Sequence, residues 1–309
     1  MPPAPGPRQA QHLREPGEQP NLGSAPPFEK STNSWPGKSV GILVFQSRDS
    51  GTQRGGTGPG VAKPPERIYN GRMESLFNFV APPTPCGYLP DQLWSLEYEV
   101  VADLTAGEYM DRMRQGWRRF GDTMFRPRCA SCHACRSLRI LANQFRPDRS
   151  QRRVRKLNDG EVRLRIGVPS VSRAKLDLYD RYHAFRTATR GWPRHEPSDP
   201  YNYRQSFVDN PFPTQEWCYY LGQRLVGVGY VDDLPGGLSA IYFFYDPECQ
   251  RRSLGTWNIL CLLKEAVRRR PPHLYLGYYV AGCASMTYKA QFRPNQALDP
   301  SGGWQDFVR

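Results

Sequence analysis

The chain has 309 residues, of which 39% are hydrophobic and 12% aromatic, so it is long enough for two modest domains or for one domain with appendages. Its formal net charge of +13 favours a polyanionic partner. Because no apolar stretch approaches the length of a membrane span and the N-terminus has no signal-peptide pattern, we expect a cytoplasmic protein with no membrane partner. In that reducing compartment, the eight cysteines are thiols or metal ligands rather than disulfides.

Residues 1–72 are predicted to be a disordered extension. They are rich in Pro and Gly and show little hydrophobic periodicity, so they cannot bury enough apolar surface to offset the entropy of the chain. The sequence from Met73 onward resembles the start of a protein, and we expect Met73 to be the natural initiator. A genuine disordered tail is the alternative.

The segment 73–157 is predicted to be a cysteine-rich, basic N-terminal domain. Its first helix begins at Thr105, the first residue of a capping-box motif, and is expected to give way at Gly121. A short strand is expected at 138–141, and a basic helix begins at Arg149 and ends in a turn.

Most of the positive charge lies between Arg112 and Lys156. This segment holds 14 Arg or Lys residues against two acids, so the rest of the chain is nearly neutral. Aromatic residues are interleaved with the cations, as in surfaces on which nucleic acids stack. The segment is therefore a predicted nucleic-acid contact.

The segment 158–309 is predicted to be an α+β domain. Its expected elements are, in order, a strand at 161–167, helices at 172–190 and from 199, strands at 216–221, 225–231 and 238–245, a helix at 253–269 and a strand at 273–277. This order looks like the acyltransferase fold of the N-acetyltransferase superfamily. In that fold, a splayed pair of strands and a helix N-terminus hold the acyl donor.

Four cysteines are candidates for one shared metal site. Cys129, Cys132 and Cys135 follow one another at i, i+3 and i+6, and Cys86 lies upstream. Short Cys-x-x-Cys steps bring thiolates close enough to share an ion or cluster, so zinc and an iron–sulfur cluster are both open. His133 is an alternative ligand, and a loop of reduced thiols is the alternative to any metal site.

Seven motifs give the chain a more specific resemblance. They are Cys86-Gly-Tyr-Leu-Pro, Gly116-Trp-Arg-Arg-Phe-Gly121, Phe125-Arg-Pro-x-Cys-x-x-Cys-x-x-Cys-Arg136, Ser150-Gln-Arg-Arg153, Ser253-Leu-Gly-Thr256, Tyr275-Leu-Gly-Tyr278 and Met286-Thr-Tyr-Lys-Ala-x-Phe-Arg-Pro294. From about Met73 to Trp304, their order and spacing closely resemble the aminoacyl-tRNA–protein transferases of the N-end rule pathway. The likeness is strongest to the bacterial branch, the aspartate/glutamate leucyltransferases.

The resemblance implies that an amino acid is transferred from a charged tRNA to the N-terminal α-amine of a protein that begins with Asp or Glu. The eukaryotic arginyl branch has a cysteine pair near the position of Cys86, whereas this chain has one cysteine there, and the three downstream cysteines are candidates to complete the set. The tRNA is expected to lie on six arginines of the basic segment, namely Arg118, Arg119, Arg126, Arg136, Arg152 and Arg153.

The implied reaction needs neither a covalent nucleophile nor a cofactor, because the aminoacyl ester is already activated. The enzyme must align amine and ester, accept a proton and stabilise an oxyanion. Backbone N–H groups at the end of one strand and the start of the next helix are the candidate oxyanion donors. The expected catalytic residues are therefore Tyr245, Asp246, Leu254, Gly255 and Thr256. The spacing of residues in the sequence does not identify a general base.

Four further residues are expected to bind the acceptor. Lys289 and Arg293 are candidate readers of its side-chain carboxylate, because cationic donors make short, strong bonds to carboxylates. Tyr242 and Tyr278 are the other two, and ordinary packing in the sheet is the alternative for any single tyrosine.

Leucine is the expected donor amino acid, with arginine as the alternative. Leucine needs a dry apolar slot, whereas arginine needs carboxylates or carbonyls for its guanidinium. Apolar residues dominate the expected cleft, namely Ile241, Phe243, Leu254, Leu276 and Val280.

Two other classes of function stay open. One is an N-acetyltransferase that uses coenzyme A, although the sequence at 250–255 lacks the glycine spacing that usually holds the pyrophosphate. The other is a non-catalytic RNA-binding module, which explains the basic segment but gives the second half no role. The oligomeric state is not indicated by the sequence.

Overall fold

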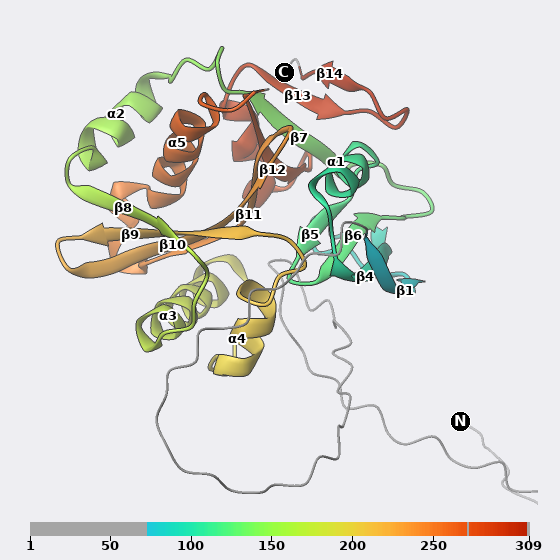
Figure 1. Ribbon diagram of the computed structural model, residues 1–309, viewed down its shortest axis with the longest axis horizontal. Coiled ribbons are helices and arrows are strands. Elements are labelled where there is room, and N and C mark those ends of the chain that lie inside the picture. The colour runs from blue at the N-terminus through green and yellow to red at the C-terminus, as the bar shows by residue number, and fades with distance from the viewer. Residues whose placement is uncertain (1–72, 271, 308–309) are drawn as a thin grey trace, which may run out of the picture.

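An eight-stranded sheet forms the centre of the molecule (Figure 1). The computed structural model describes residues 73–270 and 272–307, so the extension expected at 1–72 lies outside the described residues. The strand order is β14-β13-β7-β12-β11-β10-β9-β8. The strands are β7 (Arg136–Leu141), β8 (Val162–Gly167), β9 (Thr214–Leu221), β10 (Arg224–Leu234), β11 (Gly237–Tyr245), β12 (His273–Tyr279), β13 (Asn295–Leu298) and β14 (Trp304–Asp306). All pairs are antiparallel except β11 with β12, which is parallel.

Helices cover both faces of this sheet, which confirms an α+β protein. One face carries α2 (Arg149–Asn158) and α5 (Leu254–Ala266), and the other carries α3 (Arg173–Arg190) and α4 (Pro200–Phe207) (Figure 1). Local chemistry fixes the ends of these helices. The Asp199 side chain accepts a hydrogen bond from the Tyr201 N–H at the start of α4, and Gly191 ends α3 with a φ of 65°. No helix within the described ranges is long and apolar enough to cross a membrane.

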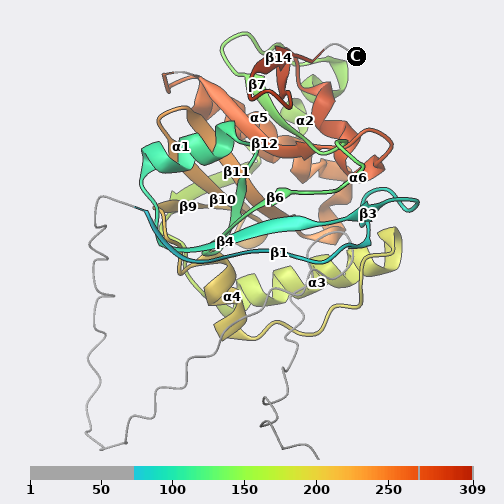
Figure 2. The ribbon, with the colours of Figure 1, turned by 90° about the vertical axis from the view of Figure 1, so that its right-hand side faces the viewer.

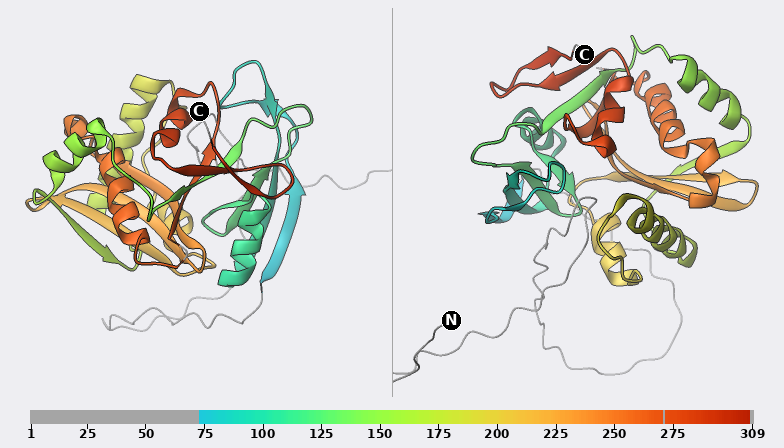
Figure 3. Two further views of the ribbon diagram at one scale, coloured as in Figure 1. Left: turned by 90° about the horizontal axis from the view of Figure 1, so that it is seen from above. Right: turned by 180° about the vertical axis from the view of Figure 1, so that it is seen from behind.

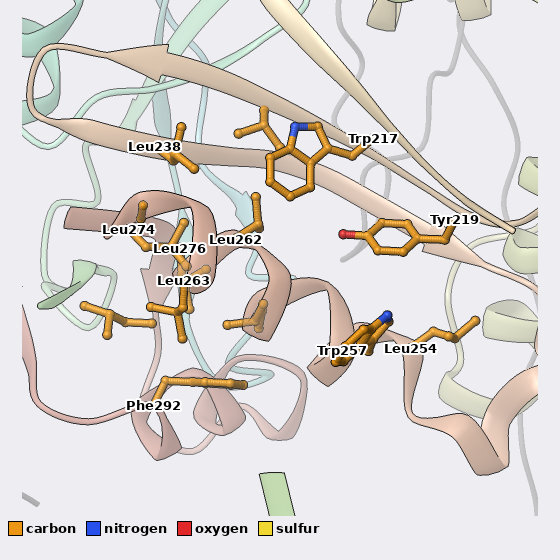
Figure 4. Packing of buried hydrophobic residues seen from close by; sticks show 14 of the residues in the cluster. Trp217, Tyr219, Leu238, Leu254, Trp257, Leu262, Leu263, Leu274, Leu276 and Phe292 are labelled. Carbon is orange, nitrogen blue, oxygen red and sulfur yellow. The ribbon is translucent and has the colours of Figure 1, made fainter. Parts of the chain in front are cut away.

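The core on the α5 face is built from large side chains that alternate along the strands. Trp217 and Tyr219 of β9 point toward α5, where Trp257 and Leu262 meet them, while Cys218 faces α3 (Figure 4). Full burial of one such side chain stabilises the fold by about 1.5–3 kcal/mol. These contacts keep α5 fixed on the sheet, so the start of α5 holds a constant position relative to β11.

A second, four-stranded sheet lies beside the first (Figures 2 and 3). Its order is β1-β4-β6-β5, with β1 (Glu74–Val80), β4 (Leu96–Asp103), β5 (Arg118–Phe120) and β6 (Thr123–Pro127), and a short hairpin joins β2 (Thr84–Pro85) to β3 (Leu93–Trp94). The sequence did not predict these strands. The helix α1 (Ala106–Arg114) has the expected capping box at Thr105, but it ends well before Gly121.

The segment 73–157, predicted to be the N-terminal domain, contributes elements to both sheets. The strand β7 pairs with β12 and β13, and α2 packs on α5, although both precede residue 158. The boundary expected at residue 157 therefore falls among the elements of the larger sheet.

Candidate active site

The parallel strands β11 and β12 pair over two residues and then part. Leu238 lies opposite Leu274 and Ser239 opposite Tyr275, and no further pairs follow toward the C-terminal ends of these strands. The register of β12 against β7 also shifts between Tyr275 and Tyr278. We call this region the strand divergence. It leaves backbone groups of two neighbouring strands without sheet partners in the middle of the molecule.

Two cations from distant parts of the chain meet at the strand divergence. Arg118 of β5 donates through Nη2 to Ser239 Oγ and to the Ala240 carbonyl, both at 3.3 Å. Lys289, in the turn η2 (Tyr288–Gln291), donates through Nζ to the Tyr278 carbonyl at 2.8 Å. A Cβ at Gly277 would lie 3.7 Å from Arg118 Nε and 3.8 Å from Lys289 Nζ, so both cations flank this glycine.

The Lys289 amine is unusual for a lysine because it can lose its proton near neutral pH. Burial, together with the neighbouring charge of Arg118, lowers the pKa of Lys289 to about 7. A substantial fraction is then an uncharged amine that can accept a proton. The same lowered pKa makes Lys289 a weaker carboxylate reader than the sequence suggested.

Aromatic side chains and one arginine surround the end of β11. Tyr245 lies 5.1 Å from Tyr182 of α3, measured between ring centroids. Arg186, one turn further along α3, lies over the rings of Trp192 at 4.8 Å and Tyr182 at 5.8 Å. Burial raises the pKa of Tyr288, while the nearby Arg186 lowers it and Tyr245 raises it. Arg186, Tyr182 and Tyr245 therefore form one cluster at the end of β11.

Asp246, an expected catalytic residue, is a buried structural anchor. Its carboxylate accepts hydrogen bonds from Arg224 and, at 3.0 Å, from Arg181, and it caps the turn η1 (Pro247–Arg252). Although burial acts to raise the pKa of Asp246, the hydrogen bond from Arg224 and those from the Glu248 N–H and Arg181 hold it below its usual range. Its oxygens are occupied, so Asp246 is a poor proton acceptor.

The other expected catalytic residues form the first turn of α5. The N-cap, Ser253, makes no side-chain cap hydrogen bond, and its φ is 51°. A Cβ at Gly255 would meet nothing within 4 Å, so the backbone is open there, whereas the Leu254 side chain is buried in the core. The first N–H groups of a helix lack intrahelical partners, so those of Leu254, Gly255 and Thr256 stay the predicted oxyanion donors.

The expected acceptor-binding residues are mostly engaged elsewhere. The Tyr278 hydroxyl donates to the Gly116 carbonyl at 2.7 Å and so ties β12 to the small sheet. The Tyr242 hydroxyl is 3.0 Å from His183 Nε2, on the α3 side of the larger sheet. Arg293 is exposed and donates to the Ala290 carbonyl at 3.3 Å. Of the four, Lys289 alone is placed by these contacts at the strand divergence.

The expected tRNA surface needs a correction at two residues. Arg119 and Asp232 form a fully buried ion pair at 2.8 Å, so Arg119 lies on no surface. Arg118 is buried too, because its guanidinium reaches inward to Ser239. Alternation along β5 puts the two side chains on opposite faces of the strand, and both faces are covered, by Ser239 and Ala240 on one side and by Asn210 and Asp232 on the other. The charge pattern of the segment does not show this.

The exposed positive charge gathers instead on α2. Arg126 is ion-paired with Glu97 at 2.7 Å, and Arg136 is half-buried over the Phe307 ring at 5.5 Å. By contrast, five cations of α2 are exposed, namely Arg149, Arg152, Arg153, Arg155 and Lys156. This helix is therefore the basic surface that the segment presents to solvent.

The four expected metal ligands line one apolar pocket, together with aromatic residues such as Tyr88 and Trp94. Burial, and then Cys129, Cys86 and Cys132 as neighbours, raise the pKa of Cys135 to about 12. A set of four cysteines is the donor type of a thiolate-preferring ion or cluster, and Cys135 would have to lose its proton to bind one. Across 73–270 and 272–307, however, no three His, Cys, Asp or Glu side chains are grouped closely enough to hold a metal ion.

Two features of the site could not be read from the sequence. Gly277 lies in a motif that the resemblance had marked, Tyr275-Leu-Gly-Tyr278, but its contact with two cations had no local signal. Arg186 is one of several arginines on α3, and nothing in its neighbours distinguishes it. Its setting depends on Trp192, which lies beyond the end of the helix.

Comparison with known proteins identifies the family. Residues 84–153 match the family description "Arginine-tRNA-protein transferase, N terminus", and residues 174–299 match "Arginine-tRNA-protein transferase, C terminus". These two matches cover more than half of the chain. The protein therefore belongs to the arginine-tRNA-protein transferase family, as the motifs predicted.

Several relatives carry a more specific name, aspartate/glutamate leucyltransferase. The relative from Campylobacter jejuni (strain 81-176) is 37% identical over 216 residues, which are 69% of this chain and 89% of the relative. The relative from Pseudomonas savastanoi pv. phaseolicola is 37% identical over 71% of this chain and 92% of its own. That from Marinobacter nauticus is 37% identical over 76% and 97%. Among solved structures, L-PGS from Bacillus licheniformis aligns over 59% of this chain and 53% of its own at 13% identity, with a TM-score of 0.33.

Proposed function

We propose that this protein transfers leucine from leucyl-tRNA to the N-terminal α-amine of proteins that begin with Asp or Glu, which marks them for degradation by the N-end rule pathway. The observation that carries this proposal is the alignment with aspartate/glutamate leucyltransferases over 89–97% of their length. Three of the motifs quoted for the family bring a residue to the strand divergence, namely Arg118, Gly277 and Lys289. Arginine stays the alternative donor amino acid.

The proposed chemistry is aminolysis of an ester. The acceptor amine loses a proton to the uncharged Lys289 amine and attacks the ester carbonyl, forming the C–N bond. The tetrahedral intermediate collapses by breaking the C–O bond to the terminal ribose, and the leaving ribose oxygen takes the proton back from Lys289. Arg118 and the first N–H groups of α5 supply the positive potential for the oxyanion. No cofactor takes part in this transfer.

The fold supports an acyl-transfer site of the N-acetyltransferase type. The parting of two parallel strands and a helix that begins beside β11 are the two features that such a fold uses to hold an acyl donor. The small sheet with the cysteine loop is the proposed N-terminal domain. The tRNA backbone is proposed to lie along α2, because its exposed cations can bind phosphates.

The apolar side chains near the strand divergence favour leucine over arginine. Leu254, Leu276 and Val280 are buried, whereas Asp246 is already paired with Arg224 and Arg181. Asp246 therefore offers no unpaired carboxylate to the guanidinium of an arginyl donor. We place the leucyl side chain among these apolar residues.

The four pocket cysteines are proposed to bind zinc or an iron–sulfur cluster as a structural group. The residues that would hold it are Cys86, Cys129, Cys132 and Cys135, and binding would require their sulfurs to draw together and lose protons. Anaerobic purification followed by iron, sulfide and zinc analysis tests this. Stoichiometric metal that is lost in a Cys132→Ser variant supports the site, and metal-free protein with full activity contradicts it.

One incubation separates the proposed function from its alternatives. The protein is mixed with leucyl-tRNA, acetyl-coenzyme A and a peptide that begins with Glu, and the peptide is weighed by mass spectrometry. An added leucyl residue supports the proposal. An added acetyl group would indicate a coenzyme-A-dependent acetyltransferase, and retained tRNA with an unmodified peptide would indicate an RNA-binding module.

A further inference from the structure

Arg186 is held beside the strand divergence without a counter-ion. The aromatic rings of Trp192 and Tyr182 fix its guanidinium at centroid distances of 4.8 and 5.8 Å. Its Nε is buried and has no hydrogen-bond partner within the described part of the chain. None of the ion pairs formed between described residues includes it. An unsatisfied buried donor on a charged group is costly, and a bound ligand is one way in which this cost is offset.

Its surroundings suit a small anion next to the reacting groups. Arg186 lies over the Tyr182 ring at 5.8 Å, and that ring lies 5.1 Å from Tyr245 at the end of β11. Arg186 and Tyr245 also shift the pKa of Tyr288 in opposite directions. Tyr288 directly precedes Lys289, the proposed proton acceptor. An anion bound by Arg186 would therefore lie near an amine that is poised to attack at the strand divergence.

The other cations of this region are already engaged. Arg118 binds Ser239 Oγ and a carbonyl oxygen, and Arg181 is ion-paired with Asp246. Lys289 binds the Tyr278 carbonyl, and burial favours its uncharged form. Arg186 is thus the guanidinium beside the site that keeps its donors for a ligand.

We propose that Arg186 binds the side-chain carboxylate of the N-terminal Asp or Glu of the acceptor and thereby selects acidic N-termini. A guanidinium offers two parallel N–H groups that match a carboxylate, and the two rings hold its plane in advance. A phosphate of the tRNA end is the other source of an anion. The half-buried aromatic setting of Arg186 favours the carboxylate, since the exposed cations of α2 already offer contacts to the backbone. This inference rests on the proposed function.

The test compares two peptides that differ only in the first residue, Glu or Gln, with leucyl-tRNA as donor. The variants are Arg186→Ala, Arg186→Lys and, as a matched control, Arg190→Ala, which removes an exposed arginine of the same helix. The readout is the ratio of kcat/KM for the Glu peptide to that for the Gln peptide. Because it is a ratio, it does not depend on the fraction of folded enzyme. The KM for leucyl-tRNA is measured alongside.

In the wild-type protein and in Arg190→Ala, the ratio is expected to be high. In Arg186→Ala, kcat/KM for the Glu peptide is expected to fall about 10- to 100-fold and that for the Gln peptide little, so the ratio collapses. The ratio for Arg186→Lys should lie between those of the wild-type protein and Arg186→Ala, because lysine keeps the charge but not the two parallel N–H groups of the guanidinium. An unchanged ratio in Arg186→Ala would overturn the inference, and a raised KM for leucyl-tRNA with an unchanged ratio would assign Arg186 to a phosphate. No transfer by the wild-type protein to either peptide would overturn the proposed function, and this inference with it.

Discussion

The side-chain nitrogen of Lys289 lies 2.8 Å from the carbonyl oxygen of Tyr278, at a point where β12 has parted from β11. A carbonyl in a regular sheet would bind the N–H of a neighbouring strand. Here a lysine takes that place, and burial, together with the neighbouring charge of Arg118, lowers its pKa and disfavours its charged form. The lysine with the lowered pKa therefore lies where the sheet is irregular.

Lys289→Met is expected to lower kcat/KM by about 10²–10⁴-fold, the range typical of a lost general base. In the wild-type protein, kcat/KM should rise with pH through about 7, because the uncharged amine is the active form. Lys289→Arg keeps a cation but cannot lose its proton, so it should be impaired at every pH. Lys264→Met, an exposed lysine of α5, serves as the control. Wild-type rates in Lys289→Arg would show that only the charge is needed.

Gly277→Ala is expected to impair catalysis through the backbone. The φ of Gly277 is +75°, a conformation that costs a residue with a side chain about 1–2 kcal/mol, and the glycine is flanked by Arg118 and Lys289. Gly160→Ala is a matched control, since its φ is +82° and nothing lies within 4 Å of the added carbon. Both variants should lose similar stability in urea unfolding, but only Gly277→Ala should lose kcat. Equal kcat values for Gly277→Ala and Gly160→Ala would show that Gly277 is not part of the active site.

Breaking the buried pair of Arg119 and Asp232 is expected to be strongly destabilising. Asp232→Asn leaves the Arg119 charge buried without its partner, which costs about 3–5 kcal/mol. The neighbouring Asp233, whose side chain is 39% exposed, pairs with Arg269 on the surface, and Asp233→Asn should cost only about 0–1 kcal/mol. Chemical denaturation of the two variants makes the comparison. Similar stabilities would contradict a structural role for Arg119.

The helix α2 is expected to carry much of the affinity for tRNA. Reversing two of its exposed charges, Arg152→Glu with Arg153→Glu, should weaken binding and flatten its dependence on salt concentration. The control pair, Arg173→Glu with Arg204→Glu, alters exposed arginines on α3 and α4, across the sheet from α2 (Figure 1). Filter binding over a range of salt concentrations provides the measurement. Equal losses in both pairs would argue against a specific surface on α2.

Local chemistry explains what could be predicted from the sequence. The capping box at Thr105, the left-handed Gly191 and the Asp199-Pro200 start of α4 all act within one helical turn, so short patterns locate them. The hairpins from β9 to β11 were found for the same reason. The larger sheet gains β7 through pairing with β12, and β13 through pairing with β7, across long stretches of chain, and no local pattern encodes such partners.

In the functional site, too, the sequence predicted some features, whereas others depend on long-range packing. Lys289 could be predicted because it lies in a motif of the family, whereas the burial that lowers its pKa comes from packing against β12. The charge run suggested that Arg118 and Arg119 face a nucleic acid, but β5 turns both toward the protein interior. Arg186 depends on a ring beyond its own helix. Charge and spacing show which residues are present, and the long-range packing decides which of them reach the site.

Parallel reactions with leucyl-tRNA and arginyl-tRNA test the central claim most directly. Each is supplied to a peptide that begins with Glu and to one that begins with Gln, and the products are identified by mass. We expect leucine to be added to the α-amine of the Glu peptide, with little product from arginyl-tRNA or from the Gln peptide. Efficient arginine transfer without leucine transfer would contradict it.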